Sequence, residues 1–157
     1  MTALIETRLS LDAVRVCEVM TRDFVRLTPD VSLLEAFGAM VRSGVHHMPV
    51  VRADGRCLVL LDMTTVLRRL PEDLVAQGTA PLCPPGSAGP LSVLADAPLT
   101  FAAAVMDDAG ADACCAVDAQ GRMVGLLTAR DVLRVVRAPQ VALRTCSSGE
   151  SGKGYKG

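Results

Sequence analysis

The chain has 157 residues, half of them hydrophobic and 21% charged, with a formal net charge of −1. This length is enough for one ordinary domain or two small ones that share a core, so we expect folding without metal or disulfide staples. A near-neutral charge, with no Lys/Arg cluster interleaved with aromatic residues, argues against nucleic acid and anionic membrane surfaces as partners.

The apolar and metal-ligating residues exclude further classes of protein. Apolar runs such as CLVLL (57–61) fall far short of the roughly 18 residues that a membrane span needs, and the start of the chain shows no secretory pattern. We therefore expect a cytoplasmic protein. The six cysteines include no CxxC, which favours buried thiols. His46 and His47 would point to opposite faces of a strand, so we expect no metal site.

The first predicted elements are a short apolar strand at 24–27 and a helix. Ser32 and Glu35 have the spacing of a capping box at the helix start, and Gly44 suits a left-handed stop. Apolar strands at 48–51 and 57–61 follow, separated by a polar turn that Gly55 closes, and then a second helix. The order is β-α-β-β-α. The residues that would form the buried face of the first helix are Leu33, Ala36, Phe37, Met40 and Val41.

Residues 71–90 are rich in Pro and Gly and read as a connecting segment, with a short helix near Leu74. A shift of 66 positions (55 to 121) then aligns a second copy without a gap. Its strand lies at 91–94, Pro98 suits the first turn of its helix, and Gly110 repeats the helix stop. We infer a tandem duplication whose two units cover each other's sheets with pseudo-two-fold symmetry.

The predicted fold is therefore α/β (α+β), a tandem pair of β-α-β-β-α units. We expect an N-terminal segment at 1–15, a first unit at 16–70, a linker at 71–90, a second unit at 91–137 and a flexible tail at 138–157. The tail's SGESGKG lacks the first Gly and the hydroxyl residue of a phosphate-binding P-loop, and no strand or helix flanks it suitably.

Three stretches of the repeat carry a family resemblance: VCEVMTRD (16–23), GVHHMPVV (44–51) and GLLTARDVLR (125–134). With the duplicated unit, they make residues 16–137 resemble the CBS domain pair, the cystathionine-beta-synthase-type or Bateman module. The resemblance implies adenine nucleotides or adenosyl compounds held in clefts between the two copies. It also implies regulation of an enzyme, channel or transporter.

Thr128 and Asp131 admit two interpretations. Their spacing is that of a capping box, so both could simply satisfy helix amides. The resemblance instead implies that Asp131 anchors the ribose hydroxyls, that Thr128 adds a polar contact and that Arg130 meets a phosphate. Gly125 would let a ligand or backbone approach closely. The ligand-binding residues expected on this basis are Ser92, Ala111, Asp112, Ala113, Thr128, Arg130 and Asp131.

The first copy differs at these positions. It reads Asp62-x-x-Thr65, so we expect Asp62 to cap the helix while the ribose carboxylate is missing from its usual place. The first copy keeps the adenine-side segment of the family, whereas the second has Asp112 there, which would repel phosphate if it faced the cleft. A candidate second ligand site therefore comprises Val45, His46, His47, Pro49 and Asp62.

The resemblance implies a non-catalytic regulatory module that forms a homodimer and acts on an unidentified partner protein. It requires no cofactor, and its regulatory ligand would be AMP, ADP, ATP or S-adenosylmethionine. The alternative is a ligand-free module for interaction or dimerisation. An enzyme with Cys114 or Cys115 as nucleophile is a third interpretation, disfavoured because apolar flanks predict burial, which opposes thiolate formation.

Overall fold

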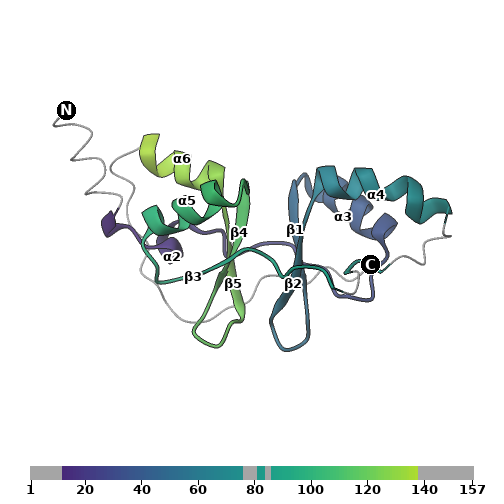
Figure 1. Ribbon diagram of the computed structural model, residues 1–157, viewed down its shortest axis with the longest axis horizontal. Helices are drawn as coiled ribbons and strands as arrows, with labels where there is room; N and C mark the ends of the chain where they lie inside the picture. The colour runs from purple at the N-terminus through teal and green to yellow at the C-terminus, as the bar shows by residue number, and fades with distance from the viewer. Residues whose placement is uncertain (1–11, 76–80, 84–85, 138–157) are drawn as a thin grey trace. The chain divides into compact units, whose positions relative to one another are not determined.

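The computed structural model describes residues 12–75, 81–83 and 86–137, which form two compact units (Figure 1). Among these residues, unit 1 comprises 12–23 and 91–137, and unit 2 comprises the described residues from 24 to 90. Both units mix helices with strands, which confirms the predicted fold class. The pseudo-two-fold packing of the units stays a prediction, and the expected flexible tail lies outside the described residues.

Unit 2 follows the predicted order after its first strand. Helix α3 (Leu33–Ser43) leads to β1 (His47–Val51), β2 (Cys57–Asp62) and α4 (Met63–Val75), and the two strands pair antiparallel. The capping box is present: the Glu35 amide donates to Ser32 Oγ at 3.2 Å, and the Ser32 amide donates to Glu35 Oε2 at 2.9 Å. Gly44 ends α3 with φ 63°, a left-handed conformation that glycine adopts without a steric penalty.

Unit 1 repeats this arrangement with a sheet of three strands, where unit 2 has a sheet of two. After α2 (Val16–Val19) come β3 (Ser92–Leu94), α5 (Leu99–Asp108), β4 (Ala113–Val117), β5 (Met123–Thr128) and α6 (Ala129–Arg137). Strand β3 pairs parallel to β4, and β4 pairs antiparallel to β5. Helices α5 and α6 contact each other on one side of the sheet (Figure 1).

The strand predicted at 24–27 is reduced to isolated bridges at Arg26 and Leu27, and Leu27 pairs with Val50. Leu27 still makes both ladder bonds, from its amide to the Pro49 carbonyl and from the Val51 amide to its own carbonyl. In unit 1 the ladder continues because the Ala95 amide donates to the Val117 carbonyl. The equivalent residue of the first copy is Pro29, which has no N–H to donate, so the pairing stops.

The segment that precedes each copy packs in the unit formed by the other copy. Val16 and Met20 belong to the core of unit 1, where the Val16 amide donates to the Ala97 carbonyl. Leu82, which the 66-residue shift aligns with Val16, is buried in the core of unit 2. Arg69 holds this segment through 2.8 and 3.1 Å hydrogen bonds to the carbonyls of Pro81 and Leu82. Compact units and sequence repeats therefore have different boundaries.

Two details of the chain differ from the sequence expectations. Helix α4 runs through Pro71 to Val75, so the short helix expected near Leu74 is the last turn of α4 and not a separate element. Cys17 is disulfide-bonded, whereas Cys57, Cys83, Cys114 and Cys115 are thiols. The prediction of buried thiols thus holds for Cys114 and Cys115 and is wrong for Cys17.

No helix in the described part of the chain is long and apolar enough to cross a membrane.

Candidate functional site

In unit 1, the sheet brings the start of β4 and the end of β5 to one corner, where α6 begins. Ala113 pairs with Thr128 across the two strands, and the Ala129 amide donates to the Asp112 carbonyl at 2.8 Å. Ala111 is held by its amide, which donates to the carbonyl of Met106 in α5. The predicted residues 111–113, 128, 130 and 131 therefore lie together.

Thr128 and Asp131 form a reciprocal cap at this corner. The Asp131 amide donates to Thr128 Oγ1 at 3.3 Å, while the amide and hydroxyl of Thr128 donate to Asp131 Oδ2 at 3.0 and 2.7 Å. Arg134 occupies the other carboxylate oxygen through a 3.3 Å ion pair with Oδ1. Asp131 is only 5% exposed, so in unit 1 its carboxylate serves the start of α6.

Arg134 is the residue at this site that the sequence analysis missed. It lies three residues after Asp131 on the same helix, a spacing that brings side chains together. This spacing could have predicted the ion pair from the sequence. A ribose hydroxyl that reached Asp131 would share Oδ1 with Arg134 or replace it.

Unit 2 has the same backbone frame with a different cap. His47 pairs with Asp62, the Met63 amide donates to the His46 carbonyl at 2.9 Å, and the Thr65 amide donates to Asp62 Oδ1 at 2.8 Å. This confirms the prediction that Asp62 caps the following helix. Burial raises the pKa of Asp62, but hydrogen bonds from Thr65 and the nearby His47 charge outweigh burial and hold it below its ordinary value.

The remaining predicted residues surround these corners at different depths. Ser92 opens β3 level with Cys115, two residues further into the sheet than Ala113. Val45 precedes β1 and donates its amide to the Met40 carbonyl, whereas Pro49 is buried within β1, opposite Leu60. His46 and Asp112 are exposed at equivalent positions of the two copies.

Gly125 does permit a close approach, but the approaching group belongs to the protein. A Cβ at Gly125 would collide with the side chain of Met20, whose Cγ would lie only 2.7 Å away. Met20 is buried in the core of unit 1, and the neighbouring Thr21 forms a bridge with Leu126. The role of Gly125 visible in this unit is therefore to admit Met20 against β5.

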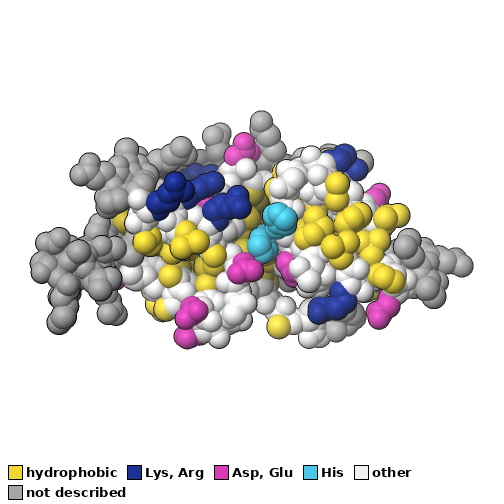
Figure 2. Space-filling model, turned by 90° about the horizontal axis from the view of Figure 1, so that it is seen from above, with side chains coloured by type: hydrophobic (Ala, Val, Ile, Leu, Met, Phe, Trp, Pro, Cys, Tyr) yellow, Lys and Arg dark blue, Asp and Glu magenta, His cyan; other side chains and the backbone are white. Residues whose placement is uncertain are grey.

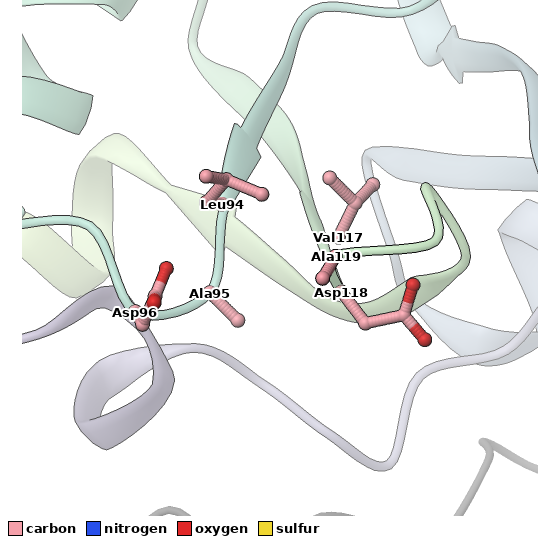
Figure 3. A pocket seen from close by; sticks show the side chains of 6 residues that line it. All are labelled: Leu94, Ala95, Asp96, Val117, Asp118 and Ala119. Atoms are coloured by element: carbon pink, nitrogen blue, oxygen red, sulfur yellow. The ribbon is translucent and has the colours of Figure 1, made fainter.

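A shallow pocket of unit 1 lies away from the corner (Figure 3). It has a volume of about 180 Å³ and is lined by Leu94, Ala95, Asp96, Val117, Asp118 and Ala119. These residues lie at and just after the carboxyl ends of β3 and β4, whereas the corner lies at the amino end of β4. None of the predicted ligand-binding residues lines this pocket.

The cysteines of β4 and the metal-ligating side chains bear on the enzyme interpretation and on a metal site. Cys114 is fully buried, and this burial raises the pKa of its thiol to about 11, so very little thiolate forms near neutral pH. Cys115 is buried beside it in β4. Within the described ranges, no group of three or more His, Cys, Asp or Glu side chains could hold a metal ion.

Comparison with known proteins supplies a family and a set of similar structures. The family model described as "CBS domain" matches residues 16–72 and 87–138. Uncharacterized protein MJ1404 of Methanocaldococcus jannaschii is 32% identical over 120 residues, which are 74% of this chain. The chain spans only 26% of that relative's length.

Three solved structures share the fold at low sequence identity. The CBS domain pair of MJ0100, in complex with 5'-methylthioadenosine and S-adenosyl-L-methionine, is 17% identical with a TM-score of 0.65 over 78% of this chain and 98% of that one. CBSX2 in complex with AMP is 21% identical with a TM-score of 0.68, over 80% and 97%. PAE2072 of Pyrobaculum aerophilum, also complexed with AMP, is 23% identical with a TM-score of 0.64, over 80% and 100%.

Proposed function

Since this chain belongs to the CBS domain family, we propose that it is a regulatory module that binds an adenine nucleotide or adenosyl ligand and catalyses no reaction itself. The carrying observation is that both units build the same corner. In each unit, the first amide of the last helix (α4 or α6) donates to the carbonyl of the residue just before β1 or β4. The third amide of the same helix donates to a capping side chain. The AMP, methylthioadenosine and S-adenosylmethionine bound by similar CBS structures support this ligand class.

The proposed contacts in unit 1 come from the exposed rim of its corner. Arg130 is exposed at the second position of α6 and could meet a phosphate or carboxylate. Asp112 is exposed beside the first amide of α6, and Ser92 is exposed at the start of β3. Thr128 and Asp131 would contact the ribose from the cap. In unit 2, the proposed contacts are His46, His47 and Asp62, which the 66-residue shift aligns with Asp112, Ala113 and Thr128. Val45 and Pro49 complete this proposed second site.

A ligand screen tests this function. Melting curves of the full chain would be recorded with AMP, ADP, ATP and S-adenosylmethionine, with GMP as a control for the purine base. A ligand present at 100 times its Kd stabilises the folded state by about 2.7 kcal/mol. We expect at least one adenosyl ligand to raise the Tm, and titration calorimetry would then give its Kd. No shift with any adenosyl ligand at millimolar concentration would refute the proposal.

One observation favours the second candidate function, a ligand-free module for interaction. Both carboxylate oxygens of Asp131 are already engaged within unit 1, as a helix cap requires. In that case the screen would show no shift, while the protein would still self-associate.

Self-association is part of the proposal in either case. Figure 2 looks onto the helices and shows hydrophobic side chains on the surface of both units. Burying such side chains against a second copy would stabilise a homodimer. The exposed hydrophobic side chains available for this contact are Leu34, Val41 and Leu67 in unit 2, and Phe101, Leu133 and Val136 in unit 1.

The cytoplasmic location and the regulated partner protein stay predictions.

A further inference from the structure

Two opposite charges flank the start of α6. The Asp112 carbonyl accepts the hydrogen bond of the Ala129 amide at 2.8 Å, and Arg130 is the next residue of the helix. Both Asp112 and Arg130 are exposed. Because Asp112 is tied to the helix through its own backbone, both charges stay close to one helix end.

Among the residues that the structure describes, no ion pair joins Asp112 or Arg130 to an opposite charge. The described ion pairs include Arg52–Asp54, Arg122–Asp118 and Arg134–Asp131. The charge of Asp131 is thus balanced by Arg134, so the carboxylate of Asp112 and the guanidinium of Arg130 are the charges of this corner without a described ion-pair partner.

The equivalent corner of unit 2 lacks this pair. The 66-residue shift aligns Asp112 with His46 and Arg130 with Thr64. His46 uses its carbonyl in the same way, accepting from the Met63 amide at 2.9 Å. The two corners share a backbone frame, so the difference between them lies in the charges that they present.

We propose that Asp112 and Arg130 make the corner of unit 1 selective for a zwitterionic adenosyl ligand, namely an adenosyl amino acid, over a nucleotide; this rests on the proposed function. Arg130 would bind the carboxylate of the amino acid, since a guanidinium matches that group geometrically. Asp112 would attract its ammonium group. A nucleotide has only negative groups here, so attraction by Arg130 is offset by repulsion from Asp112.

Three probes separate the charged groups from the adenosyl part. S-adenosylhomocysteine carries the amino acid, 5'-methylthioadenosine lacks it, and AMP replaces it with a phosphate. Titration calorimetry would measure the Kd of each probe for the full chain and for D112N and R130Q. The matched control is D96N, which removes an exposed carboxylate of unit 1 beyond β3, at the opposite end of the sheet. Melting curves would check that all variants remain folded.

The charges predict a specific pattern. The wild type binds S-adenosylhomocysteine more tightly than methylthioadenosine or AMP. D112N weakens S-adenosylhomocysteine about two- to tenfold, the scale of one charge contact near the surface, and tightens AMP. R130Q weakens both and leaves methylthioadenosine unchanged, and D96N resembles the wild type.

The outcomes distinguish this inference from the function on which it rests. If the wild type prefers AMP, or D112N leaves the preference among the probes unchanged, the selectivity is refuted while the ligand-binding function stands. If no probe binds the wild type or D112N, both the function and the selectivity are refuted.

Discussion

Thr128 and Asp131 bind each other in both directions at the start of α6, with the Thr128 amide 3.0 Å from the carboxylate and the Asp131 amide 3.3 Å from the hydroxyl. In the first copy the order of the two residue types is reversed, and Asp62 caps α4 by accepting from the Thr65 amide. Either order caps the helix, because the residue before a helix needs only a side-chain oxygen that reaches the third amide. The reversal therefore changes which side chains surround the corner without changing the frame.

Replacing Asp131 by Ala tests whether this cap also binds ligand. Loss of the cap should lower the free energy of unfolding by about 1 kcal/mol, read from melting curves. Under the proposed function, binding of an adenosyl ligand should also weaken by about 1.5–3 kcal/mol, the value for a hydrogen bond to a charged group. Thr65→Ala is the control and should change binding little. If D131A binds as tightly as the wild type while D62A loses binding, the ligand-binding unit is unit 2.

Gly125→Ala should destabilise unit 1 by about 1–3 kcal/mol, because the new methyl group would overlap the side chain of Met20. Chemical denaturation would measure this loss. The double variant M20A/G125A should show coupling, with less destabilisation than the two single changes added together. Gly110→Ala is a useful contrast, because a Cβ there meets nothing within 4 Å and only the φ of 61° opposes it. Additive losses in M20A/G125A would contradict this account.

The Asp62 cap should depend on pH. Its folded-state pKa is depressed below the ordinary value of 3.8, so its contribution to stability is present above that value. The contribution is lost as the pH falls through the folded-state pKa. The difference in unfolding free energy between the wild type and D62A should therefore be constant near neutral pH and shrink below about pH 4. A difference that grows on acidification would have the wrong sign for a charged cap.

Thiol labelling tests the burial of β4. Burial places the pKa of Cys114 at about 11, and Cys115 is buried as well, so neither should react with iodoacetamide in the native protein at pH 7. Both should react once the chain is unfolded in denaturant, which is the positive control. Peptide mass spectrometry would locate the label. Rapid native labelling of either residue would restore the enzyme interpretation.

Light scattering at micromolar concentration should give the mass of a dimer. Leu133, which is 65% exposed on α6, should lie in the buried surface, so Leu133→Asp should shift the equilibrium towards the monomer. Leu94→Asp, on β3 and 51% exposed, provides the matched control away from the helices. A monomeric wild type would exclude the homodimer.

Local chemistry is what the sequence could determine by itself. The capping box of Ser32 and Glu35, the left-handed glycines and the cap at Asp62 depend on residues within four positions of each other, so their spacing suffices. The 66-residue repeat extends this to the whole unit, because matching residues in two copies imply matching elements. The fold class followed from the same repeat, and the family followed from the resemblance of motifs such as GLLTARDVLR (125–134) to those of the CBS domain pair.

Contacts between distant segments were decided only by the tertiary structure. The space beside Gly125 holds Met20, which is over a hundred residues earlier in the chain, and Leu82 fills the core of unit 2 from within the predicted linker. The strand expected at 24–27 has the right residues, yet its ladder ends where Pro29 has no amide to give. Whether a glycine admits a ligand or a methionine depends on which segment folds back onto it, and no local pattern encodes that choice.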